Sequence, residues 1–148
     1  MPELRFSIDI KRPPEPIFNL IADLANYSHW LPPSGTYAET KDISDSPVKA
    51  GTTYVDKNRL NTMYGKVTQF TPYSVIVFHQ ATKNPGMAIT TRYELSPSVG
   101  GTHLIRTTTI ELRGVYRLLQ PMIVPPTRKE NERTLQALKT YLEADNSR

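Results

Sequence analysis

Polar and apolar residues alternate at the start of the chain, and this alternation predicts a half-buried strand from Leu4 to Lys11. The apolar positions of that strand are Leu4, Phe6, Ile8 and Ile10. The prolines of Pro13–Pro16 then indicate the start of a short helix, because a proline's missing N–H costs nothing in a first helical turn. A second short helical or looped piece, Asn26–Pro33, follows and ends at two prolines.

The middle of the chain reads as a series of strands separated by short turns. The six expected strands are Thr36–Ile43, Thr52–Asn58, Asn61–Thr71, Ser74–Thr82, Met87–Ser96 and Thr102–Arg113. Separators as short as Pro72-Tyr73 require antiparallel neighbours, because parallel strands need crossovers of about a dozen residues or more. The pattern predicts an α+β domain with segregated helices and strands, spanning residues 1–148 as one unit.

A long helical pattern ends the chain. Pro125-Pro126 is expected to break or kink it, and Thr127 with Glu130 matches a capping box that would restart it. The leucines 135, 138 and 142 then form one apolar stripe. A helix from Arg128 to Asp145 would be about 27 Å long, close to the width of six or seven strands at ~4.8 Å each. Such a helix can cross a curved sheet and cover it, an arrangement that tends to leave a cavity between the two.

Composition excludes several classes of function. With no cysteine there are no disulfides, thiolate nucleophiles or cysteine metal sites, and the three histidines are too far apart for metal-ligand spacing. The net charge of +4 comes without a nucleic-acid-binding motif, and the last helix mixes cations with glutamates. We therefore expect no nucleic-acid partner. No apolar run reaches the ~20 residues of a membrane span, so we expect no stable membrane insertion, and the absence of cysteine fits a cytoplasmic protein.

Strand pairing predicts which side chains face the cavity, because directly paired residues share a face. Pairing Leu95 with Leu104 sets Tyr93 beside Arg106 and also sets Thr91 beside Thr108. Because each tight turn pairs a strand with the one before it, the same rule predicts which residues of the earlier strands point inward. They are Tyr54, Asp56, Met63, Gly65, Val67, Gln69, Ile76, Phe78, Gln80, Met87 and Ile89, with His79 pointing outward.

Arg106 is the most informative member of this face. A buried guanidinium is costly unless it is paired, so it would need a carboxylate, a ligand anion or water. The alternative is an arginine at the rim of the sheet whose head reaches solvent.

Four segments carry a resemblance to a known superfamily. They are RFSIDIKRPPEPIFNLIADLANYSHWLPP, KAGTTYVD, GKVTQFTPYSVIVF and the terminal GGTHLIRTTTIELRG with its helix. The chain resembles the START/Bet v 1-like superfamily, in the polyketide cyclase/dehydrase and lipid-transport branch of the SRPBCC proteins. The resemblance implies a helix-grip fold: a seven-stranded curved antiparallel sheet around a long C-terminal helix, with two short helices between strands 1 and 2. It also implies a hydrophobic cavity, and members bind lipids, sterols, hormones or polyketides while some catalyse cyclisation or dehydration.

The leading hypothesis is that the protein binds a small hydrophobic or amphipathic ligand, as a monomer or a homodimer and without a cofactor. The residues expected to contact the ligand are Trp30, Tyr54, Asp56, Met63, Val67, Phe78, Gln80, Ile89, Thr91, Tyr93, Arg106, Thr108 and Met122. Trp30 lies near the cavity mouth by the resemblance, and could equally be a core plug beneath its loop.

Two alternatives remain open. One is a cyclase, aromatase or dehydratase in which Tyr93 donates a proton, Arg106 steadies a developing enolate and Asp56 completes the set. No catalytic residue is assigned, since no nucleophile elbow, P-loop or dinucleotide fingerprint occurs. The other alternative is a protein-interaction module with a filled core.

Overall fold

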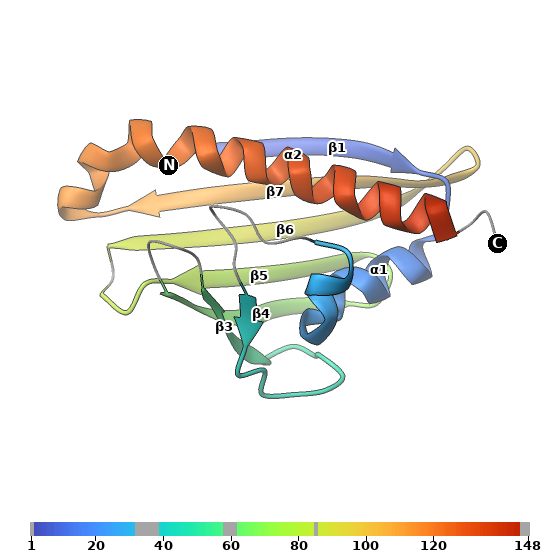
Figure 1. Ribbon diagram of the computed structural model, residues 1–148, viewed down its shortest axis with the longest axis horizontal. Helices are drawn as coiled ribbons and strands as arrows, with labels where there is room; N and C mark the ends of the chain where they lie inside the picture. Colours follow the sequence, from blue (N-terminus) through green and yellow to red (C-terminus); the bar gives the residue numbers. More distant parts are fainter. Residues whose placement is uncertain (1, 32–38, 58–61, 85, 146–148) are drawn as a thin grey trace.

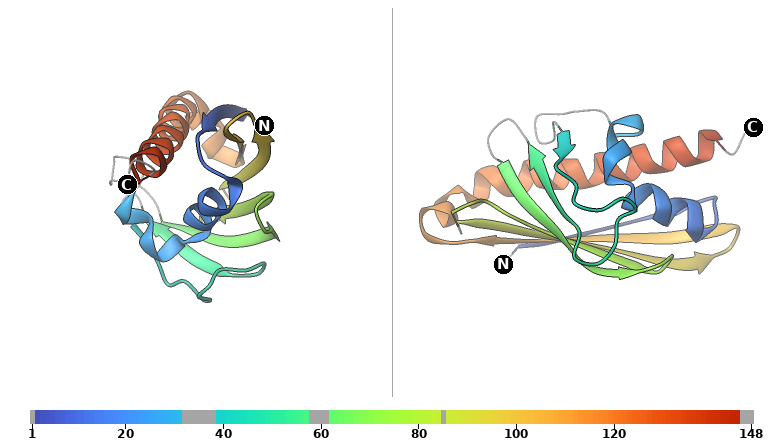
Figure 2. Two further views of the ribbon diagram at one scale, coloured as in Figure 1. Left: turned by 90° about the vertical axis from the view of Figure 1, so that its right-hand side faces the viewer. Right: turned by 90° about the horizontal axis from the view of Figure 1, so that it is seen from below.

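The computed structural model describes residues 2–31, 39–57, 62–84 and 86–145. Its strands are β1 (Glu3–Ile10), β2 (Glu39–Lys41), β3 (Thr53–Lys57), β4 (Thr62–Thr71), β5 (Val75–Ala81), β6 (Met87–Ser98) and β7 (Gly101–Leu112). Its helical segments are α1 (Pro14–Ala22), the 3₁₀ segment η1 (Leu24–His29), the 3₁₀ segment η2 (Gly114–Leu119) and α2 (Gln120–Asp145). The strands form one curved sheet, and α2 runs along its concave side (Figure 1; Figure 2).

The sheet has seven strands in the order β1-β7-β6-β5-β4-β3-β2, and all of its neighbours are antiparallel. The expected α+β helix-grip architecture, with two short helical segments between the first two strands, is therefore confirmed. Of the expected strand Thr36–Ile43, Glu39–Lys41 form a strand and residues 42–43 do not, while residues 36–38 lie outside the described part of the chain. Residues 32–33 of the expected second helical piece, and residues 58 and 61 at two expected strand ends, lie outside it as well.

The predicted pairing of the last hairpin is confirmed. Tyr93 lies opposite Arg106 and Thr91 opposite Thr108. The hairpin turn at Val99-Gly100 sets this register, because Gly100 takes a positive φ of 78° that favours glycine.

Gln69 was expected to face inward, and this is wrong. The register of β4 against β5 shifts between Val67 and Gln69, so one extra residue is accommodated there. Val67 pairs with Phe78, but Phe70 rather than Gln69 takes the next inward position, opposite Ile76. Gln69 is exposed on the outer face, where its side chain accepts a hydrogen bond from Arg92.

Pro125-Pro126 was expected to break or kink the C-terminal helix, and the break is wrong. Helix α2 begins at Gln120 and continues through Pro125 and Pro126, so it extends for 26 residues, about 39 Å. The prolines leave unpaired only carbonyls near the exposed start of the helix, where water can solvate them. Thr127 is not an N-cap, because its Oγ1 donates to the Ile123 carbonyl one turn earlier at 2.8 Å.

The hydrophobic core is concentrated at one end of the layer between sheet and helix. There α1 buries Ile17, Phe18 and Ile21 completely, and α2 adds its stripe of Leu135, Leu138 and Leu142. Figure 1 shows α1 beside the C-terminal half of α2 and no such helix beside the N-terminal half. The packing therefore leaves room between the sheet and the first half of α2.

Candidate functional site

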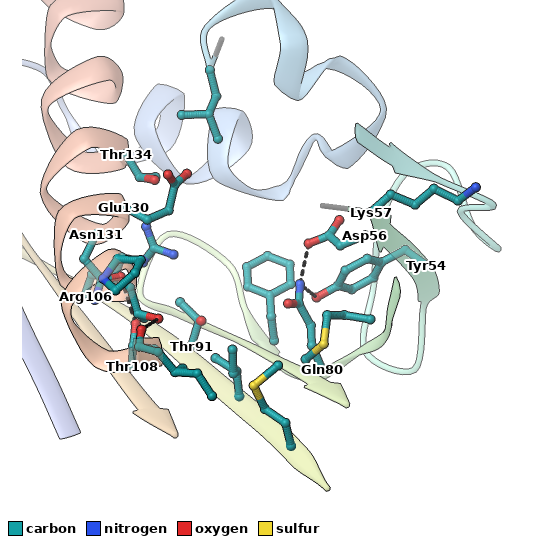
Figure 3. A pocket seen from close by; sticks show the side chains of 18 of the residues that line it. Tyr54, Asp56, Lys57, Gln80, Thr91, Arg106, Thr108, Glu130, Asn131 and Thr134 are labelled. Atoms are coloured by element: carbon teal, nitrogen blue, oxygen red, sulfur yellow. Dashed lines mark hydrogen bonds between the residues drawn. The ribbon is translucent and has the colours of Figure 1, made fainter. Parts of the chain in front are cut away.

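A pocket of about 620 Å³ lies between the concave face of the sheet and the N-terminal half of α2. Inward residues of β3 to β7 supply its floor, and residues of η1, η2 and α2 supply the remaining walls (Figure 3). Most of this lining is apolar. The apolar residues include Leu24, Leu31, Met63, Phe78, Met87, Ile89, Leu119, Met122 and Ile123.

Three aromatic rings form a row across the floor. The rings of Tyr54 and Phe78 meet edge to face with centroids 6.0 Å apart, and those of Phe78 and Tyr93 do so at 6.2 Å. Gly65 makes room for one end of the row, because a Cβ at this position would collide with the Tyr54 ring. The row gives the pocket floor a continuous aromatic surface.

The polar groups at one side of the pocket come from β7 and α2. The guanidinium carbon of Arg106 lies 5.3 Å from the centre of the Tyr93 ring. Within the described part of the chain, Arg106 Nε and Nη1 are buried and have no hydrogen-bond partner. Thr108 Oγ1 donates to Asn131 Oδ1 at 2.9 Å, whereas Asn131 Nδ2 is buried and has no partner among the same residues. This side of the pocket therefore presents unpaired N–H donors that a ligand oxygen could accept from.

Beside these groups, Glu130 forms a two-point ion pair with Arg133, from Nε at 3.1 Å and from Nη2 at 2.8 Å. Both residues belong to α2, one turn apart. Glu130 also lines the pocket, so the charge around Arg106 is mixed rather than purely positive.

Asp56 lies at the opposite side, on β3 (Figure 3). Its carboxylate accepts a hydrogen bond from Thr40 Oγ1 at 2.6 Å and another from Gln80 Nε2 at 2.5 Å. The same amide of Gln80 also donates to the Tyr54 hydroxyl at 3.0 Å. Burial raises the pKa of the Asp56 carboxyl, and the two hydrogen bonds oppose that shift only in part.

Burial has a similar effect on the phenols around the pocket. It raises the pKa of Tyr54 and of Tyr93, and the nearby Arg106 lowers that of Tyr93 only in part. It also raises the pKa of Tyr27, whose hydroxyl donates to the Ile21 carbonyl at 2.6 Å. A phenol with a raised pKa holds its proton more tightly, so Tyr93 is poorly suited to donate one.

The structure places most of the residues that sequence reasoning selected on the pocket wall. They are Tyr54, Asp56, Met63, Phe78, Gln80, Ile89, Thr91, Tyr93, Arg106, Thr108 and Met122. Val67 and Trp30 are buried in the core instead, and Trp30 packs edge to face on Tyr27 at 5.2 Å. Of the candidate enzymatic set, Arg106 and Tyr93 are in contact, whereas Asp56 lies across the pocket from Arg106 (Figure 3).

Sequence reasoning missed the face that α2 turns toward the pocket. Thr127, Glu130, Asn131 and Thr134 all line it. Their spacing of three, four and seven residues places them on one side of a helix. That polar stripe is visible in the sequence, but an expected helix break at Pro125-Pro126 places Thr127 at a helix end and outside the stripe.

The described residues contain no group of three histidine, aspartate or glutamate side chains able to hold a metal ion. His79 lies against Thr90 Oγ1 at 3.0 Å on the outer face of the sheet, and His103 lies against Asp9 at 2.8 Å. In the same described part, no helix has the length and apolar character needed to cross a membrane.

Comparison with known proteins gives one family match over nearly the whole chain. The model of the family described as "Polyketide cyclase / dehydrase and lipid transport" matches residues 1–143. No curated protein sequence matches the chain.

Solved structures share the fold at low sequence identity. Ara h 8.0201 is 11% identical with a TM-score of 0.75, and the alignment covers 97% of this chain and 98% of that one. The protein MLL2253 from Mesorhizobium loti is 15% identical with a TM-score of 0.72, covering 97% and 98% respectively. The Aha1 dimer from Colwellia psychrerythraea is 19% identical with a TM-score of 0.66, covering 94% of each chain.

Proposed function

Because this chain belongs to the polyketide cyclase/dehydrase and lipid transport family, we propose that its pocket binds one small, mainly apolar molecule that carries polar groups. The observation that carries the proposal is the pocket itself. Its volume of about 620 Å³ falls within the range of roughly 300–1,000 Å³ that is typical of small-molecule sites. A mainly apolar lining with a few converging polar groups is also typical of such sites.

The unpartnered N–H donors of Arg106 and Asn131 favour one orientation of the ligand. Buried N–H groups without an acceptor are costly, so a carbonyl or carboxylate oxygen of the ligand would stabilise Arg106 and Asn131. At the opposite side, the Asp56 carboxyl would hold a ligand hydroxyl. An elongated molecule with an oxygen acceptor at one end and a hydroxyl at the other fits both sides.

An enzyme of the cyclase or dehydratase type is the second candidate. It is favoured by Asp56, a buried carboxyl on the pocket wall whose raised pKa brings it closer to neutral pH. Proton donation by Tyr93 is the weaker part of this candidate, because burial raises the pKa of that phenol. A filled interaction module is the least supported candidate, since it requires a solid interior and the pocket is open space.

The proposal is tested by displacement of a fluorescent probe. Anilinonaphthalene sulfonate is bound to the purified protein and displaced with dodecanoic acid, dodecanol or dodecane. We expect the acid to displace the probe best, because it alone supplies a charged oxygen acceptor to Arg106. Ile89→Trp, which fills the pocket, should abolish probe binding, whereas Val99→Trp, in a fully exposed turn, should not.

Failure of all three compounds to displace the probe from the native protein would contradict the proposal, and so would equal probe binding by Ile89→Trp. The enzymatic candidate is tested with Asp56→Asn. An enzyme variant of this kind should keep the affinity for its substrate and lose turnover, whereas in a binding protein only the affinity changes.

A further inference from the structure

Four apolar side chains are exposed together where β7 passes into α2. They are Val115 at 73% exposure, Leu118 at 80%, Leu119 at 39% and Met122 at 70%. Their spacing of three, four and seven residues places them on one side of the turns formed by η2 and the start of α2. We call these four residues the η2 patch. Large apolar side chains clustered in solvent mark an interaction surface more often than isolated ones do.

The η2 patch borders the mouth of the pocket. Val115, Leu119 and Met122 line the pocket and are also exposed, so they mark a place where it opens to the outside. Leu118 does not line the pocket and is the most exposed of the four. The Tyr116 ring packs against Gly86, and Arg113 N–H donates to the Gly86 carbonyl at 2.9 Å, which fixes this segment to the β5–β6 turn.

Positive charge is concentrated in the same segment. Residues 112–129 contain Arg113, Arg117, Arg128 and Lys129 and no aspartate or glutamate. Glu111 and Glu130 stand just outside this segment, and Glu111 pairs with Arg113 at 3.9 Å, whereas Arg117 lies in η2 among the residues of the η2 patch. All four cations are exposed. A partner that is both anionic and apolar would match this combination of exposed side chains best.

We propose that the η2 patch docks on an anionic lipid surface, with its apolar side chains inserted among the lipids and its cations against the headgroups. A bilayer offers both an anionic face and an apolar interior to a surface of this kind. A symmetric contact with a second copy would place the same cations against each other. A nucleic acid would leave the exposed leucines and methionine without a partner.

Docking in this place brings the pocket mouth against the bilayer, where apolar molecules partition. This proposal concerns docking on a membrane, so it can be wrong even if the pocket binds a ligand, and the reverse also holds. Vesicle binding is measured without any ligand, and Leu118 and Arg117 are not part of the pocket wall.

The test is co-flotation of the full chain with vesicles of phosphatidylcholine alone and with vesicles of phosphatidylcholine and phosphatidylserine. We expect binding to the anionic vesicles only, and weaker binding at high salt. Arg117→Gln should lower the partition coefficient about five-fold, the contribution of one basic residue near such a surface. Leu118→Ser should lower it about ten-fold through the loss of apolar insertion.

Two matched variants serve as controls. Val99→Ser removes an apolar side chain that is even more exposed than Leu118, from the β6–β7 turn at the opposite end of β7. Arg5→Gln removes an exposed cation from β1. Both should bind vesicles as the native protein does. The proposal is overturned by absent binding to anionic vesicles or by equal loss in the controls. It is also overturned if soluble polyglutamate binds as tightly as vesicles and Leu118→Ser changes neither affinity.

Discussion

Replacing the buried Thr108–Asn131 pair with apolar residues of similar shape separates a structural role of the pair from a ligand-binding role. Asn131 is 1% exposed and Thr108 also 1%, and their single hydrogen bond joins β7 to α2. The amide nitrogen of Asn131 is buried without a partner in the described part of the chain. A pair kept for stability alone would not be expected to leave that donor unsatisfied.

The magnitudes follow from what each change removes. Thr108→Val with Asn131→Leu loses one buried hydrogen bond, worth about 0.5–1.5 kcal/mol net, and removes an unsatisfied donor that costs about 1–3 kcal/mol. The double variant should therefore be more stable than the native protein by about 0–2 kcal/mol. Asn131→Leu alone leaves the Thr108 hydroxyl buried without its acceptor, so it should be less stable than the double variant by about 1–2 kcal/mol.

Urea denaturation followed by circular dichroism measures these differences, and a change of 1 kcal/mol corresponds to about 2–4 °C in Tm for a protein of this size. Thr107→Val, on the outer face of β7, is the matched control and should stay within about 0.5 kcal/mol. The double variant should at the same time lose about ten-fold or more in affinity for dodecanoic acid. Destabilisation of the double variant by more than about 1 kcal/mol would refute the reasoning, because it would show that the pair is structural.

Three further predictions concern single positions. Asp56→Asn should raise the free energy of unfolding at neutral pH, and should change it less below the ordinary carboxyl pKa of 3.8. The reason is that burial raises the pKa of Asp56, so the charged carboxylate is the form that the folded state disfavours. Equal effects at both pH values in urea titrations would contradict this. Gly65→Ala should cost about 1–3 kcal/mol and weaken probe binding, since its methyl group displaces the Tyr54 ring from the pocket floor; unchanged denaturation and probe titration curves would disprove the contact. Pro126→Ala should raise stability by up to about 3 kcal/mol, because it restores a backbone donor inside α2; a lower urea midpoint would show that the proline shapes this helix.

The antiparallel pairing of strands joined by short turns, and the shared face of Tyr93 and Arg106, followed from the sequence because tight turns force consecutive strands to pair. The pairing of β1 with β7 did not follow from it, because residues 11–100 lie between these strands. With Leu95 opposite Leu104, the alternation of side chains along a strand determines which residues of the hairpin point inward. The bulge after Val67 could not be predicted in this way. The bulge adds one residue to β4, and no glycine or proline marks its position in the sequence. As a result Phe70 points inward and Gln69 outward, the reverse of the prediction.

The polar side of the pocket was predicted only in part. Arg106 stood out because a charged residue occupied an inward strand position, whereas Asn131 was overlooked on a helix that was expected to begin at Arg128. The prolines at positions 125 and 126 argue locally against a helix. The structure keeps the helix because the carbonyls that they leave unpaired belong to an exposed segment. Solvation of that kind depends on tertiary placement, which local sequence does not encode.

Native mass spectrometry of the freshly purified protein and of Ile89→Trp tests the central claim most directly. For the native chain we predict a second mass peak from one small molecule, which solvent extraction releases and which the tryptophan variant lacks. A single unliganded mass for the native chain, unchanged after incubation with dodecanoic acid, would contradict the claim that the pocket under α2 binds a ligand.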